Sequence, residues 1–555
     1  MFFLLGFVKL QSVYIFVSSA RLRFSETMKK PNGICNHSNE DVIQESEILG
    51  KLPLLYDDDS GYKSRRFLSS TENDYKEHEP QTSFHELDAL FQDTTPPICL
   101  QELADIESQY SELIKPCAEG QDVVGSEASE RKLSTDEVIR LGGERFIQSR
   151  SSTSINNISI SSHPYVSLFS GLSDQELKEI QLVEYLLLCS EKVSQQHFER
   201  SSMLLDWCDE LSSSSGNPIQ RIVYYFSKAL REKIDKETKG ITLSGLGKKH
   251  VYDIESRMMN PNMTTISIYQ KLPFYQAGHF SGTQVMVDRL SRSKRVHVID
   301  LSIRQGVHST ILMQALSSQP DSRTKHLKIT AVGTGFETQI KQTGDRLKSF
   351  AASLNLSFSF NMVIVEDMRD FNKDLLELDS KEALGVYSSY GLWSLIPQQD
   401  RLEHLMKVIK STKPRVMLVC ETATNLNSSS FVNRFIEALF HYGAVFDSLE
   451  DCMDREDENR LITESMYLGK GIRSIVTDEG SERVIRHVNI DVWRKFFSRF
   501  GMKEIGFSIS SLYQAMLVAE KISGGSSCTF DMEGNSLVIG WKGTPIQCLS
   551  AWKFS

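Results

Sequence analysis

The sequence lacks the cysteine and histidine spacings that hold a metal ion. Its nine cysteines are scattered over 555 residues, with no Cys-x-x-Cys pair and no Cys/His cluster at ligand spacing. We therefore expect no structural zinc site and no other bound metal. Because an odd, dispersed set of cysteines is typical of reduced thiols, the sequence favours a cytosolic or nuclear compartment.

Motifs of common catalytic sites are also absent. The chain has no Gly-x-Ser-x-Gly nucleophile turn, no His-Glu-x-x-His zinc motif and no P-loop. It also lacks the clustered glycines of a dinucleotide-binding turn. We therefore predict that the protein is not an enzyme and binds no cofactor.

The chain has little positive charge and few long apolar runs. Its 62 basic and 72 acidic residues give a formal net charge of −10, which argues against a surface that wraps nucleic acid everywhere. The apolar residues 1–27 are interrupted by Lys9 and Gln11, so we expect no membrane helix there. We interpret residues 1–27 as an extension upstream of a working start at Met28, with a cleaved signal peptide as the alternative.

Residues 28–165 are rich in Ser, Asp, Glu and Asn, a composition that predicts a mostly disordered acidic region. Two amphipathic helices are expected within it, near residues 84–93 and 98–114. Neither contains Lys or Arg. Leu103 and Ile106, on the apolar face of the second helix, are candidate contacts for a partner protein. The alternative is that one of these helices packs against the main domain.

The folded region is expected at residues 172–555. Residues 172–290 have helical periodicity throughout and predict a mainly helical cap, with a capping box at Ser173 and Glu176. From residue 291 to 555, apolar strands alternate with helices, which predicts an α/β core with a mostly parallel sheet. The expected parallel strands are "RVHVIDL", "HLKITAVG", "FSFNMVIV", "EALGVYSSY" and "PRVMLVCE", and a terminal hairpin is expected in "NSLVIGWKGTPIQCLSAWKF".

Residues 172–555 resemble a GRAS domain, the plant-specific family of transcriptional regulators. The five blocks of that family are similar, in order, to segments that contain "VEYLLLCSEKVS", "KRVHVIDLSIRQG", "HLKITAVGTG", "PRVMLVCETATN" and "GWKGTPIQCLSAWKF". The resemblance implies a Rossmann-like core, similar to S-adenosylmethionine-dependent methyltransferases, with an all-helical cap. It also implies a nuclear regulator that works through other GRAS proteins and DNA-binding transcription factors, as a homo- or heterodimer.

The sequence departs from the family pattern at several positions. Where many members have Gln-Trp-Pro after the second block, this chain has His308, Ser309 and Thr310. The first block reads VEYLL where many members have Leu-x-x-Leu-Leu, and no DELLA segment is recognisable. These departures indicate a divergent branch, without the segment that docks on the gibberellin receptor.

Residues around the expected first core strand have a structural interpretation. We expect Asp300 to cap the turn or to bond neighbouring backbone amides. Gly306 is the single glycine of the turn, which is weak evidence for a nucleotide-binding turn. We expect His297, in mid-strand, to be a packed imidazole. Further along, Arg434 and Glu437 are interpreted as a surface pair or a latch between domains. The aromatic residues interpreted as core or interface contacts are Trp541 and Trp552.

Two sets of residues are candidates for partner contacts. The cap leucines that we expect to contact another GRAS protein or a DNA-binding factor are Leu182, Leu186, Leu187 and Leu204. The basic residues that are candidates for direct DNA contact or nuclear import are Arg289, Arg292, Lys294 and Arg295. The sequence thus favours a non-enzymatic interaction scaffold. Sequence-specific DNA binding is the alternative, and residual small-molecule binding or methyltransferase activity is a third hypothesis.

Overall fold

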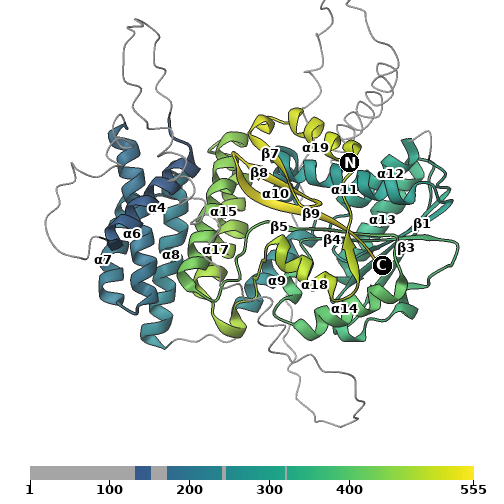
Figure 1. Cartoon of the computed structure of the whole chain (residues 1–555), viewed down its shortest axis with the longest axis horizontal. Helices are drawn as coiled ribbons and strands as arrows, with labels where there is room; N and C mark the ends of the chain where they lie inside the picture. The colour runs from purple at the N-terminus through teal and green to yellow at the C-terminus, as the bar shows by residue number, and fades with distance from the viewer. Residues whose placement is uncertain (1–131, 152–171, 241–245, 319–321, 555) are drawn as a thin grey trace, which may run out of the picture.

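The computed structural model describes residues 132–151, 172–240, 246–318 and 322–554 (Figure 1). The predicted helices that carry Leu103 and Ile106, and the expected extension at residues 1–27, lie outside the described residues. None of the described helices is both long and apolar enough to span a membrane.

The centre of the protein is a nine-stranded sheet with the order β3-β2-β1-β4-β5-β9-β8-β7, in which β6 also pairs with β9. Strands β1 to β5 are parallel, and β9, β8 and β7 continue the sheet antiparallel. This confirms the predicted α/β core and its terminal hairpin. The strands are β1 (Arg295–Asp300), β2 (His326–Gly333), β3 (Ser357–Ile364), β4 (Ala383–Ser389), β5 (Val416–Thr422), β6 (Met502–Glu504), β7 (Cys528–Glu533), β8 (Ser536–Trp541) and β9 (Thr544–Phe554).

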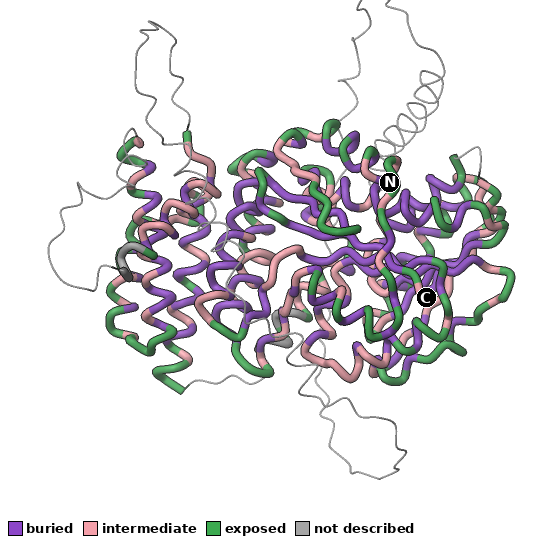
Figure 2. The backbone as a smooth tube through the Cα atoms, viewed as in Figure 1, coloured by how far each residue is buried: buried purple, intermediate pink, exposed green. Residues whose placement is uncertain are grey.

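Helices cover both faces of the sheet, which is why β4 and β5 are buried along their whole length (Figure 2). Alternate residues of β5 point to opposite faces: Leu418 belongs to one apolar cluster and Val419 to the other. The helices that pack with Leu418's face are α11 (Pro273–Leu290), α12 (Val307–Ser318), α13 (Glu337–Ser353) and α19 (Ile509–Glu520). The helices on Val419's face include α14 (Gln399–Thr412) and α18 (Ile490–Ser498).

A bundle of helices forms the cap beside the sheet (Figure 1). Its helices are α4 (Thr135–Ser151), α6 (Asp174–Ser194), α7 (Phe198–Leu211), α8 (Pro218–Lys239), α15 (Phe431–Cys452) and α17 (Gly469–Thr477). The predicted cap boundary at residue 290 is therefore wrong in two respects. Helix α11 lies against the sheet, and α15 and α17 come from the predicted core segment but pack on α8.

Helix α4 lies in the region that the sequence analysis assigned to disorder, 28–165. It packs on α6 and α15 because Val138, Ile139 and Phe146 are apolar residues on one helical face, and all three are buried. The start of α6 is joined to it: Glu176 accepts hydrogen bonds from Ser173 N and from Leu133 N, each at 2.9 Å. The bond from Leu133, followed by those from Ser173, lowers the pKa of Glu176. The predicted capping box is thereby confirmed.

Several short helices connect the cap to the sheet. The longer connecting helices are α9 (Leu246–Met259), α10 (Met263–Lys271), α16 (Glu458–Ile462) and a π-helix (Thr463–Leu468). Turns of 3-10 helix occupy Met368–Asp370, Lys373–Leu376, Leu392–Leu395, Gly480–Glu482 and Gly525–Ser527.

A cluster of four charged side chains joins α8 to α15, α16 and the π-helix. Arg221, Arg460 and Glu464 are buried, and Glu450 is half-buried. Arg221 Nη1 lies 2.8 Å from Glu450 Oε2, and its Nε lies 3.2 Å from Glu464 Oε1. Arg460 pairs with the same two carboxylates, and its Nε lies 3.1 Å from Glu464 Oε1. Burial of such charges is tolerated only when every one of them is paired, so the cluster restricts how the helices can be placed.

We predict that Glu464→Leu lowers the free energy of unfolding by about 3–5 kcal/mol, because it leaves two guanidinium groups buried with one carboxylate between them. The urea unfolding midpoint of the full chain measures the effect. The control is Glu456→Leu, at an exposed position on the same connection, which should leave the midpoint nearly unchanged. Equal midpoints for the two variants would contradict the role of the cluster.

Candidate functional site

The turn after β1 is closed by the protein's own groups. Asp300 ends the strand, and its Oδ1 accepts a hydrogen bond from Ser302 N at 2.9 Å. Ser302 Oγ accepts a bond from Ser389 N at 2.7 Å, which ties the turn to the end of β4. Gly306 has a φ of 75°, in the left-handed region that glycine adopts without strain. Asp300 thus bonds an amide of its own turn, as in the structural interpretation of the sequence.

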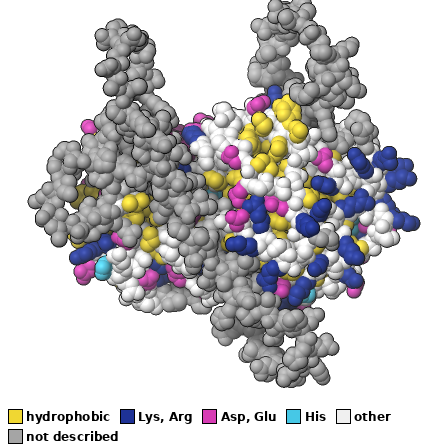
Figure 3. Space-filling view, viewed as in Figure 1, with side chains coloured by type: hydrophobic (Ala, Val, Ile, Leu, Met, Phe, Trp, Pro, Cys, Tyr) yellow, Lys and Arg dark blue, Asp and Glu magenta, His cyan; other side chains and the backbone are white. Residues whose placement is uncertain are grey.

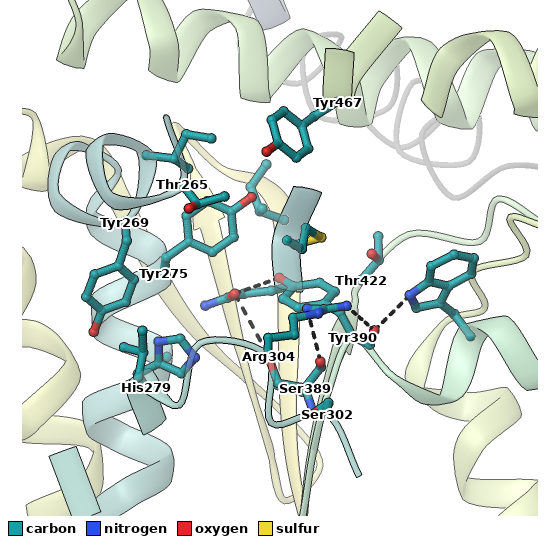
Figure 4. Close-up of a pocket in the computed structure, with 18 of the residues that line it drawn as sticks. Thr265, Tyr269, Tyr275, His279, Ser302, Arg304, Ser389, Tyr390, Thr422 and Tyr467 are labelled. Atoms are coloured by element: carbon teal, nitrogen blue, oxygen red, sulfur yellow. Dashed lines mark hydrogen bonds between the residues drawn. The ribbon is translucent and has the colours of Figure 1, made fainter. Parts of the chain in front are cut away.

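Arg304 occupies the point at which the strand order reverses between β1 and β4. Its Nη2 donates to Tyr390 O at 2.8 Å, and the same nitrogen lies 3.0 Å from Glu255 Oε1 on α9 (Figure 4). In open α/β sheets this crevice is where ligands bind. The nearby Gln305 Nε2 donates to Thr265 Oγ1 at 2.7 Å on α10. Two long side chains therefore cover the turn on which a methyltransferase-like cofactor would lie, and the turn does not fit such a cofactor.

A cavity of about 350 Å³ lies beside Arg304 at the carboxyl ends of β1, β4 and β5. Figure 4 shows Arg304 in its centre, with Tyr269 and His279 at one side and Tyr467 pointing in from the helix above. The lining contains a series of aromatic side chains, namely Tyr269, Tyr275, Tyr387, Tyr390, Trp393, Tyr442 and Tyr467. Four histidines also line it, namely His279, His308, His441 and His487. His308 stacks on Tyr387 with a distance of 3.6 Å between ring centroids.

Burial keeps most of these lining groups uncharged. It lowers the pKa of His279 and His441 to about 4 and that of His487 to about 3, so these imidazoles are neutral at pH 7. It also raises the pKa of Asp300 to about 7. Arg304 remains charged, since Glu255 raises its pKa against the effect of burial.

Glu421 lies on β5 next to the cavity-lining Cys420 and Thr422 and is itself buried. Burial raises the pKa of its carboxyl to about 8, although its Oε1 accepts a hydrogen bond from Leu392 N at 2.9 Å. The carboxyl groups of Glu421 and Asp300 therefore both have a pKa well above the ordinary value of their residue types.

His297 lies on β1, on the sheet and away from the cavity lining. Its Nε2 lies 2.8 Å from Thr330 Oγ1, and its Nδ1 lies 3.1 Å from Glu382 Oε2. Burial lowers the pKa of His297 to about 4. It is thus a packed imidazole between neighbouring strands.

Arg434 and Glu437 do not form a surface pair, because both are buried on α15. Arg434 Nη2 donates to Glu479 Oε1 at 2.6 Å and its Nε donates to Ile475 O at 3.1 Å, so it fastens α15 to the end of α17. Glu479 could not be identified as the partner from the sequence, since it lies 45 positions away.

Trp541 and Trp552 are both buried in the sheet region. Trp541 Nε1 donates to Asp447 Oδ2 on α15 at 2.8 Å, while Thr135 Oγ1 donates to Asp447 Oδ1 at 2.5 Å. Trp552 Nε1 donates to Ser550 Oγ at 2.9 Å. Trp541 thus belongs to the contact between the sheet and the cap, and Trp552 to the interior.

The predicted basic residues lie at the amino ends of the strands, opposite the cavity. Arg289, Arg292 and Lys294 are exposed, and Arg295 pairs with Glu382 at 3.3 Å. Lys325 N donates to Lys294 O at 2.8 Å, and Arg415 Nη1 donates to Ser293 Oγ at 2.8 Å. These bonds bring further exposed basic residues to the same edge. We use the name basic cluster for Arg292, Lys294, Arg323, Lys325 and Arg415.

Figure 3 shows Lys and Arg side chains gathered at the end of the molecule that carries β1 and β3 in Figure 1. Arg292 and Lys294, which are close together in the chain, are the only members of the basic cluster predicted from the sequence. Arg323, Lys325 and Arg415 were missed because parallel pairing of the strands, not sequence proximity, brings them to Arg292 and Lys294.

Three of the four cap leucines lie where a partner cannot reach them. Leu182, Leu186 and Leu187 are buried in the core of the bundle, and Leu204 is half-buried against it. This burial contradicts the prediction that Leu182, Leu186 and Leu187 contact a partner. Helix α7 instead exposes the apolar residues Met203, Trp207 and Leu211 on its outer face.

The three residues Met203, Trp207 and Leu211 recur at a spacing of four and form what we call the α7 stripe. Met203 is 66% and Trp207 is 56% exposed. Ser201, Leu205 and Cys208 occupy the opposite, buried face of α7. Helix α7 thus has apolar residues on both faces, and the sequence alone does not say which face packs on α6 and α8.

Comparisons with known proteins identify a family model and similar plant proteins. The model of the GRAS domain family matches residues 182–553. The chain is 30% identical over 387 residues to the DELLA protein GAIP of Cucurbita maxima, a match that covers 69% of this chain and 64% of that protein. It is 31% identical over 397 residues to Scarecrow-like protein 18 of Arabidopsis thaliana, covering 65% of this chain and 88% of the relative.

A solved structure has a similar fold. The crystal structure of SCL7 from Oryza sativa matches with a TM-score of 0.58 at 22% identity, covering 67% of this chain and 99% of that chain. A match at this identity supports the architecture, including a helical cap on an α/β core.

We predict that Glu421 makes the protein less stable as the pH rises. The unfolded carboxyl loses its proton near its ordinary pKa of 4.5, whereas the folded one keeps it to about pH 8. The stabilisation from this proton is therefore full below pH 4.5 and is lost progressively as the pH rises toward 8. Glu421→Gln, which can still accept the bond from Leu392, should reduce the fall in the thermal midpoint over this range.

Thermal melts of the full chain between about pH 5 and pH 9 measure this effect. Glu366→Gln, at an exposed position, is the matched control and should follow the unmodified chain. Parallel curves for the Glu421 variant and the unmodified chain would show that Glu421 does not keep its proton.

Proposed function

The chain belongs to the GRAS family, and on this premise we propose that it is a plant transcriptional regulator that acts in the nucleus as a protein-interaction scaffold. The closed turn after β1 supports a role without catalysis, because Arg304 and Gln305 cover the place where a nucleotide-type cofactor would approach the backbone. The partners that we propose are other GRAS proteins and DNA-binding transcription factors.

The α7 stripe is the single observation that supports the scaffold role best. An exposed tryptophan next to a methionine and a leucine is the kind of surface on which protein partners bind most tightly. Charged residues flank it: Arg231 Nε lies 2.6 Å from Asp209 Oδ2, and its Nη2 lies 2.8 Å from Asp206 Oδ1. An apolar centre with a charged rim is the usual anatomy of an interface. We propose that a second GRAS domain occupies the stripe.

Replacing Trp207 by Glu should weaken association with a partner GRAS protein by about thirtyfold or more, since loss of a central aromatic contact costs at least about 2 kcal/mol. Titration calorimetry against a set of GRAS proteins from the same plant, this chain included, measures the affinity.

The matched control is Tyr513→Glu, at an exposed aromatic on α19, outside the cap. Tyr513→Glu should leave the affinity unchanged. Equal losses for the two variants, or no GRAS partner for the unmodified chain, would refute this assignment of the α7 stripe.

Direct DNA binding is the second candidate function, and the basic cluster favours it. Its five exposed side chains lie just before β1, β2 and β5. The bonds from Lys325 to Lys294 and from Arg415 to Ser293 bring these segments to one edge that phosphate groups can contact. Arg295 contributes less to this surface, because Asp379 and Glu382 neutralise its charge. The same cluster, or Arg289 with it, is also a candidate signal for nuclear import.

If DNA is bound here, Arg292→Glu combined with Lys325→Glu should weaken binding at all sequences and reduce the slope of log affinity against log salt by about 2. Full-length protein titrated with a random DNA library at several salt concentrations measures both quantities. Lys228→Glu with Lys239→Glu, two exposed positions on α8, is the charge-matched control. An unchanged slope in the first pair, or the same change in both pairs, would exclude the cluster as the DNA-binding surface.

A further inference from the structure

The cavity beside Arg304 contains polar atoms that have no partner among the described residues. These atoms are Tyr269 Oη, His279 Nδ1, His308 Nε2 and His487 Nδ1, and all four are shielded from solvent. They come from α10, α11, α12 and the segment that leads to α18, so they converge from separate parts of the fold. Buried polar groups without a hydrogen bond cost stability, and convergent ones in a cavity are typical of a ligand site.

The charge of the lining restricts what such a ligand can be. The Arg304 guanidinium is neutralised by Glu255 and also donates to the carbonyls of Ser389 and Tyr390. A carboxylate or phosphate would therefore have to displace an existing partner. The histidines are neutral because of their burial, so they offer one donor or acceptor nitrogen each without attracting an ion.

The walls of the cavity are mainly apolar. Leu418, Leu549 and Ile546 form part of the sheet side, and Ile268, Leu272 and Leu468 form part of the helix side. Tyrosine rings lie between them, and burial raises the pKa of Tyr275 to about 12, so its phenol stays a neutral hydroxyl. A volume of about 350 Å³ falls within the range of small-molecule sites.

We propose that this cavity is a binding site for an uncharged, mainly apolar small organic molecule that carries hydroxyl or carbonyl groups. The apolar part packs against the aliphatic and aromatic walls, and the hydroxyl or carbonyl groups pair with the phenol of Tyr269 and the imidazoles of His279, His308 and His487. This role goes beyond the scaffold function, and the α7 stripe and the basic cluster play no part in it.

The site also lies between the two parts of the fold. The π-helix and α17 contribute Tyr467, Leu468 and Gly471 to the lining, and α17 packs on α8 of the cap. Strands β1, β4 and β5 supply the opposite wall. A ligand that contacts both walls stabilises this arrangement of cap and sheet, because it binds the folded arrangement alone.

The test uses Nile red, a neutral and mainly apolar dye with a carbonyl group, titrated into the full chain. We expect saturable binding of one dye per chain, with the blue-shifted emission of an apolar site. Thr422→Phe fills the cavity from the end of β5, and Met258→Trp fills it from the half-exposed rim on α9. Each should weaken dye binding by about tenfold or more.

One control separates the cavity from the exposed apolar surface of the cap. The double variant Met203→Ser with Trp207→Ser removes the α7 stripe and should keep the dye affinity. If circular dichroism shows that Thr422→Phe does not fold, dye binding to Met258→Trp alone tests the proposal. No saturable binding to the unmodified chain, or unchanged binding in the folded cavity variants, overturns the proposal.

The chemical class is tested with a charged probe. S-adenosylmethionine should not displace the dye and should not raise the thermal midpoint of the chain. Of the two carboxyl groups in the lining, Glu255 is already paired with Arg304, and burial favours the protonated form of Asp300. Displacement of the dye at a similar concentration would overturn the assignment to an uncharged ligand. Neither result bears on the α7 stripe, so the scaffold function stands or falls separately.

Discussion

Four charged side chains between α8, α15, α16 and the π-helix constrain how these helices can be placed. Arg221 and Arg460 share Glu450 and Glu464, and each guanidinium must keep its carboxylates within contact distance to compensate for the water it has lost. Apolar side chains tolerate small shifts, but these pairs do not. The pairing with Arg221 on α8 therefore fixes the position of the π-helix. It also fixes Tyr467 and Leu468, which the π-helix contributes to the cavity wall.

The two ends of the parallel strands have different chemistry. At the carboxyl ends, burial suppresses ionisation, and Asp300 and the histidines around the cavity are uncharged or close to it. At the amino ends, Lys294, Lys325 and Arg415 are exposed to solvent. Because strands β1 to β5 are parallel, the two environments lie at opposite ends of these strands and are separated by the length of a strand. A phosphate backbone at one end and an apolar ligand at the other would not compete.

Sequence periodicity predicted the sheet well and the sites poorly, for physical reasons. Strands β1 to β5 are continuous apolar runs bounded by turns, and that is a local signal. The cap leucines were predicted to contact a partner because the sequence of an apolar helix face does not show whether that face packs in the core or binds another protein. Helix α4 was hidden in a polar region, since only three of its residues are large, apolar and buried. The cavity has no local signal at all, because its lining extends from Ile254 to Leu549.

The cap is assembled from two separate stretches of the chain, with α15 and α17 inserted from beyond β5. It is therefore not a detachable module. A fragment that ends before residue 431 would leave the inner faces of α6 and α8 in water, including Phe226, which packs edge-on against Phe435 at a centroid distance of 5.0 Å. A chimera that exchanges caps between relatives has to carry both stretches together. A recombination breakpoint between the two stretches would pair α8 with a foreign α15, and the contacting faces of the two helices would no longer be matched.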